Sequence, residues 1–328
     1  MKKILVCNVR EDERPALEAY KQAHQDVELV LSPASLSQSA DLSDSSIDAI
    51  SIQQRDKLPQ EMYKRMQELG IAYISTRTAG YDMIDLEACK THGIHACNVP
   101  AYSPRSVAEH ALMQIFKLLR KSPEIDRRVR NHDYRWHELQ GKEIHSVCIG
   151  IIGVGRIGGT LAKLCHALGA KVLGYDLIER EEMKPYLSYV SKEELLKQAD
   201  VVSLHVDLNP SSEGLIRKAD LKLMGPESYL VNASRGPVVN TAELIEALEE
   251  GLIAGAALDT VEGEEDVFTR CFEHEAYDDK IMRLQALNQV ILTPHIAFYT
   301  NVAVQNMVDI SLDDLCLLIE GKSCEHEL

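Results

Sequence analysis

Cysteine spacing of the kind that binds metals or builds disulfide frameworks is missing from this sequence. Its eight cysteines include no C-x-x-C pair, and several stand in apolar segments, where a reduced thiol simply packs. We therefore expect no metal site. Long apolar runs are missing too: none approaches the length of a membrane span, and the apolar part of MKKILVCNVREDE is too short for a signal peptide. These absences predict a cytoplasmic protein.

Positive charge is also scarce. Lysine and arginine number 35 against 51 aspartates and glutamates, which gives a formal net charge of −16. A surface this acidic repels nucleic acid and anionic lipid, so neither is an expected partner. An anionic substrate would have to be attracted by local arginines. The 328 residues, 45% of them hydrophobic, suffice for about two domains with large cores.

A glycine-rich segment at 146–176, SVCIGIIGVGRIGGTLAKLCHALGAKVLGYD, is the feature around which the chain is organised. It predicts a buried strand, the motif G-x-G-x-x-G, a helix and a second strand. In such a motif Gly153 allows the tight turn, Gly155 lets the backbone approach a pyrophosphate, and Gly158 lets helix and strand pack closely. Asp176 ends the second strand, where a carboxylate can accept hydrogen bonds from ribose hydroxyls. An isolated G-x-G-x-x-G is often only a turn. Here a strand, a helix, a second strand and a terminal aspartate accompany the motif, and together they predict dinucleotide binding.

Strand and helix signals alternate along the whole chain, which predicts an α/β fold with parallel sheets. The expected strands lie at 4–6, 27–31, 47–52, 73–76, 95–98, 147–152, 171–175, 201–205, 229–232, 254–259 and 290–292. The main expected helices lie at about 15–24, 59–69, 86–92, 104–121 and 301–320, and Thr241 is expected to cap one that ends at Gly251. The fold predicted is two doubly wound parallel-sheet domains. A Rossmann-type cofactor domain at 102–298 is inserted into a flavodoxin-like substrate domain at 1–101 and 299–328.

Three polar residues each stand just past an expected strand, where ligands of doubly wound sheets bind. Arg235 could hold a carboxylate with two parallel hydrogen bonds, although exposed loop arginines are common. Glu264 stands in an acidic loop that could simply be solvated, and His295 could be a structural histidine. Each residue alone is a weak signal for catalysis.

These residues belong to a longer series of motifs. In chain order it runs NVPAYSP at 98–104, the glycine motif, SLHV at 203–206, NASRG at 232–236, Asp259 with Glu264 five residues on, and TPH at 293–295. In this order, and over nearly its whole length, the chain resembles the D-isomer-specific 2-hydroxyacid dehydrogenases. HDYRW at 132–136 and FYT at 298–300 are similar to the D-lactate dehydrogenase branch of that family.

The resemblance implies a role for each of the three polar residues. Arg235 would bind the carboxylate of a 2-oxoacid and polarise its carbonyl group. His295 would be the general acid when the oxoacid is reduced and the base in the reverse direction. Glu264 would bond the other ring nitrogen and favour the imidazolium. Hydride transfer would be the chemistry of NAD.

The resemblance also implies two sets of contacts. The cofactor set is Gly153, Gly155, Arg156, Ile157, Gly158, Asp176, His205, Val206, Ala233 and Asp259. The substrate set is Ile52, Thr78, Ala79, Gly80, Tyr102, Phe298 and Tyr299. The sequence departs from the family pattern at 77–80, where RTAG replaces RNVG, and at Asp207, where proline is frequent. The change at 77–80 alters side chains only, so the backbone N–H donors expected to bind the substrate carboxylate are kept. The change at Asp207 leaves the conformation of the cofactor-binding loop undetermined.

The expected activity is NADH-dependent reduction of a 2-oxoacid to the D-2-hydroxyacid, by a homodimer formed through the cofactor domain. Ile52, where lactate enzymes often have tyrosine, predicts room for oxoacids longer than pyruvate, unless Phe298 and Tyr299 fill the space. Enzymes of the D-2-hydroxyisocaproate or D-2-hydroxyglutarate type are alternatives. A non-catalytic NAD-sensing protein is another. Formate oxidation is disfavoured because family members that perform it pair the histidine with glutamine.

Overall fold

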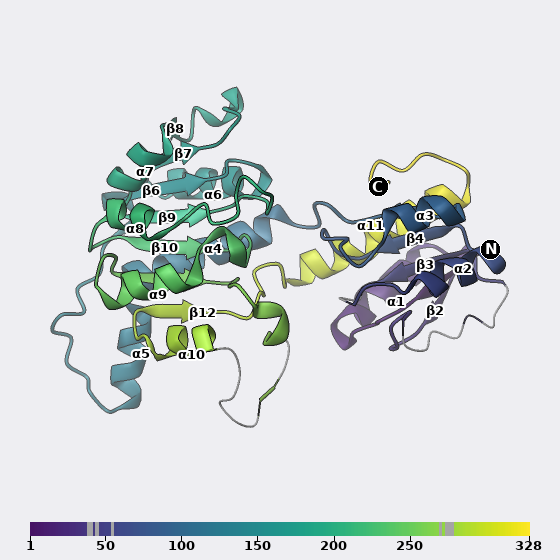
Figure 1. The fold of residues 1–328 in the computed structure, drawn as a ribbon, viewed down its shortest axis with the longest axis horizontal. Coiled ribbons are helices and arrows are strands. Elements are labelled where there is room, and N and C mark those ends of the chain that lie inside the picture. Colours follow the sequence, from purple (N-terminus) through teal and green to yellow (C-terminus); the bar gives the residue numbers. More distant parts are fainter. Residues whose placement is uncertain (38–41, 43–45, 54–55, 269–270, 273–278) are drawn as a thin grey trace. The chain divides into compact units, whose positions relative to one another are not determined.

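The computed structural model describes residues 1–37, 42, 46–53, 56–268, 271–272 and 279–328. The chain divides into two compact units, Met1–Ser103 with Tyr299–Leu328, and Pro104–Phe298. Each unit is built on one parallel sheet (Figure 1). The predicted fold class, α/β with two doubly wound parallel sheets, is therefore confirmed. No helix in the described part of the chain is long and apolar enough to cross a membrane.

The first unit holds a five-stranded sheet of order β2-β1-β3-β4-β5. Its strands are β1 (Lys2–Val6), β2 (Val27–Leu31), β3 (Ala49–Ile52), β4 (Tyr73–Thr76) and β5 (His95–Cys97). Its helices are α1 (Arg14–Ala23), α2 (Gln60–Glu68), α3 (Leu86–His92) and α11 (Asn301–Ile319), with a 3-10 turn η1 at Glu11–Glu13. Apolar residues of α1 and α11 cover one face of the sheet, and those of α2 and α3 cover the other. The chain thus returns to this unit through α11.

The second unit holds a seven-stranded sheet of order β12-β11-β10-β9-β6-β7-β8. Its strands are β6 (Cys148–Ile152), β7 (Lys171–Tyr175), β8 (Ser188–Tyr189), β9 (Val201–Leu204), β10 (Tyr229–Asn232), β11 (Gly255–Leu258) and β12 (Val290–Leu292). Its helices are α4 (Pro104–Leu119), α5 (Ser122–Arg130), α6 (Arg156–Ala167), α7 (Lys192–Gln198), α8 (Lys218–Met224), α9 (Thr241–Glu249) and α10 (Asp279–Ala286). Four 3-10 turns complete it: η2 (Ile144–Ser146), η3 (Glu181–Met183), η4 (Gly236–Val238) and η5 (Glu264–Asp266).

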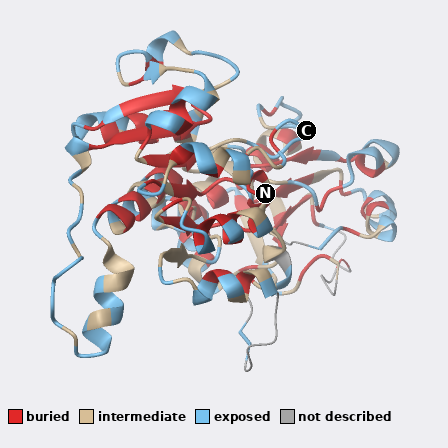
Figure 2. Ribbon diagram, turned by 60° about the vertical axis from the view of Figure 1, so that its left-hand side comes forward, coloured by how far each residue is buried: buried red, intermediate tan, exposed pale blue. Residues whose placement is uncertain are grey.

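The burial pattern explains why the strands of this sheet read as continuous apolar runs. All residues of β6, β9, β11 and nearly all of β10 are buried, because helices cover both faces (Figure 2). Helices α4 and α6 pack on one face. Helices α8, α9 and α10 pack on the other. By contrast α5 has no buried residue, so it stands out from the rest of its unit.

One local prediction is wrong. Thr241 is the first residue of α9, and the cap is Asn240, whose side-chain oxygen accepts from the backbone N–H of Glu243 at 3.0 Å. Both residue types can cap a helix, and asparagine is preferred over threonine at the N-cap position. Ser191 caps α7, with its Oγ accepting from Glu194 N at 3.2 Å.

Candidate active site

The glycine motif connects β6 to α6 with almost no free space at two of its three glycines. A Cβ on Gly153 would lie 2.5 Å from the carbonyl oxygen of His205, and the φ of 90° there is one that favours glycine. A Cβ on Gly158 would lie 1.9 Å from the carbonyl oxygen of Gly153. Only glycine therefore lets α6 pack this closely on its own strand, as the sequence predicted.

Gly155 is different because a Cβ there would meet no atom within 4 Å. It is the N-cap of α6, its φ is −81°, and it makes no side-chain capping bond. The N–H groups of the first turn of a helix have no partner inside the helix, and they favour anions. Open space in front of such a turn, with Arg156 and Ile157 as its first residues, fits the pyrophosphate of a dinucleotide.

Asp176 lies directly after β7, where the sequence placed it. One oxygen, Oδ2, accepts from the backbone N–H of Val154 at 2.7 Å, and this bond ties the strand end to the glycine motif. The same oxygen lies 3.1 Å from Nη1 of Arg180, which also donates to the carbonyl of Val154 at 2.9 Å. No pattern in the sequence predicts that Arg180 pairs with Asp176. Their contact puts one cation beside the carboxylate expected to bind ribose.

His205 and Val206 follow β9 and border the glycine turn. A Cβ on Gly153 would meet both of them. The Nε2 atom of His205 forms a 2.9 Å hydrogen bond with Oγ of Ser203, and its buried Nδ1 has no hydrogen-bond partner among the residues that the structure describes. Burial of the ring lowers the pKa of His205 to about 4, so the ring is neutral at pH 7. A buried ring nitrogen without a partner fits a site where a polar ligand group can bind.

The three polar residues singled out in the sequence follow three neighbouring strands. Arg235 comes after β10, Glu264 after β11 and His295 after β12, and these strands are adjacent in the sheet. The Nδ1–H of His295 donates to Oε1 of Glu264 at 2.5 Å, while Oε2 of Glu264 accepts from the backbone N–H of Val261 at 2.8 Å. Glu264 therefore fixes the ring and leaves the Nε2 atom of His295 for other partners.

The backbone of His295 adopts an unusual conformation that its neighbours hold in place. Its φ of 54° is left-handed and costs a non-glycine residue roughly 1–2 kcal/mol. Its N–H donates to the carbonyl of Asp259 at 2.9 Å. The carboxylate of Asp259, which is 2% exposed, accepts from Thr293 Oγ1 at 2.5 Å and from Ala297 N at 2.9 Å. Asp259, predicted to contact the cofactor, thus holds the loop that carries His295.

Arg235 is exposed, and the loop on which it stands is packed tightly against the loop before Glu264. A Cβ on Gly236 would lie 2.2 Å from the backbone of Val261, so glycine is required there. Nη1 of Arg235 donates to the carbonyl of Ser234 at 2.9 Å. Ala233, another predicted cofactor contact, is buried at 8% exposure just before this loop.

A fourth polar residue of this unit went unnoticed in the sequence. His110 on α4 forms a 3.1 Å hydrogen bond with Thr293 Oγ1, and its Nε2 lies 3.5 Å from Oδ1 of Asp259. Burial lowers its pKa from the ordinary value. His110 supports the His295 loop from the side of the helix. It is 183 residues from Thr293 in the sequence, and one histidine on an apolar helix gives no signal of such a contact.

The first unit carries most of the residues predicted to contact substrate. Thr78, Ala79 and Gly80 follow β4: Thr78 Oγ1 donates to the carbonyl of Gly80 at 2.6 Å, and Asn98 Nδ2 donates to that of Ala79 at 2.7 Å. The carbonyl of Tyr102 accepts from Asn306 Nδ2 at 2.6 Å. These hydrogen bonds hold the backbone in place at residues 78–80 and at Tyr102.

Arg77, directly before this turn, is fully buried. Its guanidinium donates to Glu13 Oε1 at 2.9 Å, to Ser51 Oγ at 3.0 Å and to the carbonyl of Cys7 at 2.9 Å. A buried charge is tolerated only with such partners. Arg77 therefore ties the end of β4 to β1, β3 and η1.

Ile52 lies at the end of β3 with an exposed fraction of 0%. Its side chain packs in the core of the first unit with residues such as Leu5, Ile50 and Ile74. A tyrosine in its place would have to displace core atoms. The two aromatic residues of the substrate set differ: Phe298 is partly buried against the core of the second unit, whereas Tyr299 is 49% exposed.

Comparison with known proteins agrees with this geometry. The sequence model of the "D-isomer specific 2-hydroxyacid dehydrogenase, NAD binding domain" matches residues 112–297. A D-2-hydroxyacid dehydrogenase (NAD(+)) of Clostridioides difficile is 38% identical over 322 residues, which is 97% of each chain.

Solved structures agree as well. A D-lactate dehydrogenase from Sporolactobacillus sp is 45% identical, with a TM-score of 0.91 over 99% of this chain and 98% of that one. The NAD complex of a D-isomer specific 2-hydroxyacid dehydrogenase from Lactobacillus delbrueckii ssp. bulgaricus is 36% identical, with a TM-score of 0.93 over 100% of both chains. The predictions of an oxidoreductase and of NAD as its cofactor are confirmed. The chain belongs to the D-isomer specific 2-hydroxyacid dehydrogenase family, and its second unit carries the NAD-binding domain of that family.

Proposed function

We propose that this protein is an NAD-dependent D-lactate dehydrogenase, which reduces pyruvate, or a slightly larger aliphatic 2-oxoacid, to the D-2-hydroxyacid. The single observation that carries the proposal is the hydrogen bond between His295 and Glu264. These residues follow β12 and β11, and Arg235 follows β10, the next strand of the sheet. A paired acid and imidazole beside a guanidinium is what reduction of a carbonyl group next to a carboxylate requires.

His295 is proposed to deliver the proton. Its Nδ1–H is bonded to Glu264, so Nε2 is the atom that would protonate the carbonyl oxygen of the oxoacid. The negative charge of Glu264 stabilises the imidazolium that the acid step needs. Glutamine in that position would supply the hydrogen bond without the charge, so Glu264 favours proton transfer over formate oxidation.

Arg235 is proposed to bind the substrate carboxylate. The guanidinium has five N–H donors, and only one bond, from Nη1 to Ser234, is to the protein itself among the described residues. The remaining donors suit a bidentate contact with a carboxylate. The substrate contacts of Ile52, Thr78, Ala79, Gly80, Tyr102, Phe298 and Tyr299 stay proposals that rest on the family resemblance. Burial of Ile52 in the core argues against a direct role for its side chain.

NAD supplies the hydride when bound, and the chain's own residues hold and orient it. The turn at 153–158 with Arg156 and Ile157 would take the pyrophosphate, and Asp176 the adenosine ribose. His205, Val206, Ala233 and Asp259 are proposed to complete the cofactor site.

Assembly and location are proposals as well. We propose a cytoplasmic homodimer formed through the second unit. Its exposed α5 and the segment after it carry apolar side chains such as Val129, Tyr134 and Trp136, with exposed fractions of 47%, 73% and 77%. Exposed apolar groups of this size are typical of a surface that a second chain covers.

The proposal is tested with a panel of 2-oxoacids. Initial rates of NADH oxidation are measured with pyruvate, 2-oxobutyrate, 2-oxoisocaproate and 2-oxoglutarate, with His295→Ala as the matched inactive control. We expect kcat/KM to be highest for pyruvate or 2-oxobutyrate and lowest for 2-oxoglutarate, whose distal carboxylate finds no cation. Preference for 2-oxoglutarate would contradict the substrate class, and NADH binding without turnover of any oxoacid would favour an NAD-sensing protein.

A further inference from the structure

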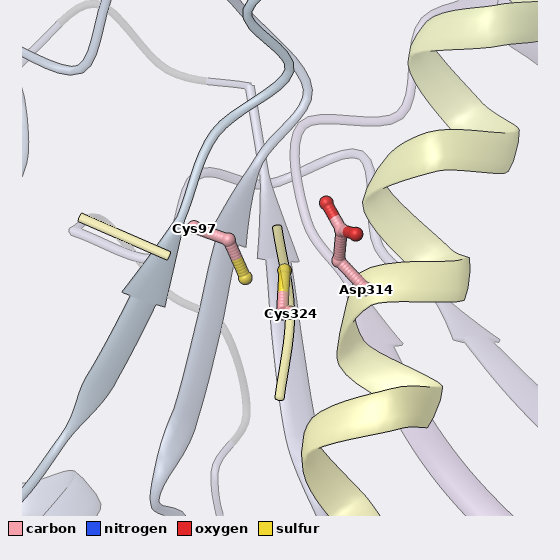
Figure 3. Close-up of side chains that lie close together, drawn as sticks. All are labelled: Cys97, Asp314 and Cys324. Atoms are coloured by element: carbon pink, nitrogen blue, oxygen red, sulfur yellow. The ribbon is translucent and has the colours of Figure 1, made fainter. Parts of the chain in front are cut away.

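Three side chains with metal-binding atoms converge in the first unit. Cys97 ends β5, Asp314 lies on α11, and Cys324 lies in the segment after that helix. One ligand atom from each lies within 4.8 Å of the others, and all three residues are buried. Figure 3 shows the two sulfurs and the carboxylate gathered between β5, the C-terminal segment and α11.

Apolar side chains pack against the two cysteines of this cluster. Cys97 and Cys324 pack with Leu318 and with the ring of Tyr73. Asp314 is only 5% exposed, and a carboxylate in such a place needs partners. One partner is His326, whose Nδ1 lies 2.9 Å from Oδ2 of Asp314, and the side chain of Cys324 forms a hydrogen bond with the same carboxylate. Carboxylates that bind metals are themselves held by hydrogen bonds, and His326 supplies one to Asp314.

A second hydrogen bond involves the sulfur of Cys324. The backbone N–H of His326 donates to Sγ of Cys324 at 3.3 Å. A backbone N–H directed at sulfur is a typical outer contact of a metal-bound cysteine. The segment that carries both residues is itself fixed to β5, because Leu328 N donates to the carbonyl of Ala96 at 2.9 Å.

We propose that Cys97, Cys324 and Asp314 bind one thiophilic divalent cation of the zinc class, with His326 holding Asp314 in place. Two thiolates select zinc-like ions over magnesium or calcium, which prefer oxygen ligands. Tetrahedral zinc with Zn–S bonds of about 2.3 Å sets its ligands roughly 3.7 Å apart, so the present cluster would contract by about 1 Å at most. Three protein ligands would leave the fourth tetrahedral position for a water molecule. The ion is structural: it fixes the C-terminal segment on β5 and α11.

Cobalt(II) is the probe, because thiolate ligation gives it intense near-ultraviolet charge-transfer absorbance. The full-length reduced enzyme carries Cys271→Ser, which removes an exposed thiol. We expect saturable absorbance at one equivalent of Co²⁺ per chain. Cys324→Ser should lower affinity at least about tenfold and remove about half of the charge-transfer absorbance.

The matched control is Cys89→Ser, which removes another buried thiol of the same unit and should leave the titration unchanged. Cys97→Ser repeats the test on the other sulfur, and Asp314→Asn should weaken binding but keep the thiolate bands. NADH binding by each variant verifies that it has folded. The proposal is overturned if no saturable absorbance develops or if both cysteine variants titrate like the control. A Cys97–Cys324 disulfide in the enzyme as isolated, found by non-reducing peptide mass spectrometry, would overturn it too.

Discussion

Two glycines of the same motif should respond in opposite ways to the same added methyl group. Gly155→Ala places a Cβ where no atom lies within 4 Å, at a φ of −81° that alanine accepts. Gly158→Ala places a Cβ 1.9 Å from the carbonyl oxygen of Gly153, a backbone atom that cannot rotate away as a side chain could. The first change fills the space proposed for the pyrophosphate, whereas the second forces the helix away from its strand.

The magnitudes follow from this difference. For Gly158→Ala, overpacking against a rigid neighbour costs roughly 1–3 kcal/mol, which corresponds to a decrease in Tm of about 2–12 °C for a unit of this size. For Gly155→Ala the free energy of unfolding should change by less than about 1 kcal/mol, because nothing is displaced. Losing one backbone hydrogen bond to a charged phosphate costs about 1.5–3 kcal/mol, so the Kd for NADH should rise about 10- to 100-fold.

The assay is thermal unfolding of each variant without cofactor, followed by fluorescence titration with NADH. Gly155→Ala should unfold like the wild type and bind NADH weakly. Gly158→Ala should unfold at a lower temperature before any ligand is added. If Gly155→Ala binds NADH with unchanged affinity, the pyrophosphate does not lie at this turn, and the reasoning about the site fails.

Three further outcomes are expected. Asp176→Ala should improve kcat/KM for NADPH relative to NADH at least about tenfold, because Arg180 loses its carboxylate partner and can bind a 2′-phosphate. The double variant that also carries Arg180→Ala should lose this gain. His295→Ala should reduce kcat at least about a hundredfold with the Kd for NADH unchanged, because the group that would deliver the proton is removed. His205 has a folded pKa of about 4, below the ordinary 6.5, so the unfolded state binds the extra proton between these values. Stability should therefore decline as the pH falls from about 6.5 to 4, by up to roughly 3 kcal/mol, and His205→Gln should flatten that decline in urea titrations.

Features that depend on neighbouring residues could be predicted from the sequence. The glycine motif, its strands and Asp176 span 31 residues, and each glycine has a local steric reason visible in the spacing. Arg235, Glu264 and His295 could be placed together because each follows a strand, and parallel strands present their carboxyl ends at one edge. The small helices α8 and α10 and the two-residue strand β8 were not expected, since such short segments give little periodic signal.

Contacts between distant segments could not be predicted. His110 reaches Thr293 across 183 residues, and no local pattern connects a helix to the loop after β12. Cys97 and Cys324 stand far apart without metal-ligand spacing, so the sequence indicated no metal site, although the fold brings them together with Asp314. The orientation of Ile52 was also undetermined, because all four residues of β3 are buried and alternation cannot reveal which face a side chain takes.

The most direct test of the proposed function is the configuration of the product formed from pyruvate and NADH. The enzyme is incubated with both until NADH is consumed, and the lactate is resolved by chiral chromatography, with His295→Ala as the control. We predict D-lactate in an amount equal to the NADH oxidised, and no product above background from the variant. L-lactate, a racemate, or NADH oxidation without lactate would contradict the proposal.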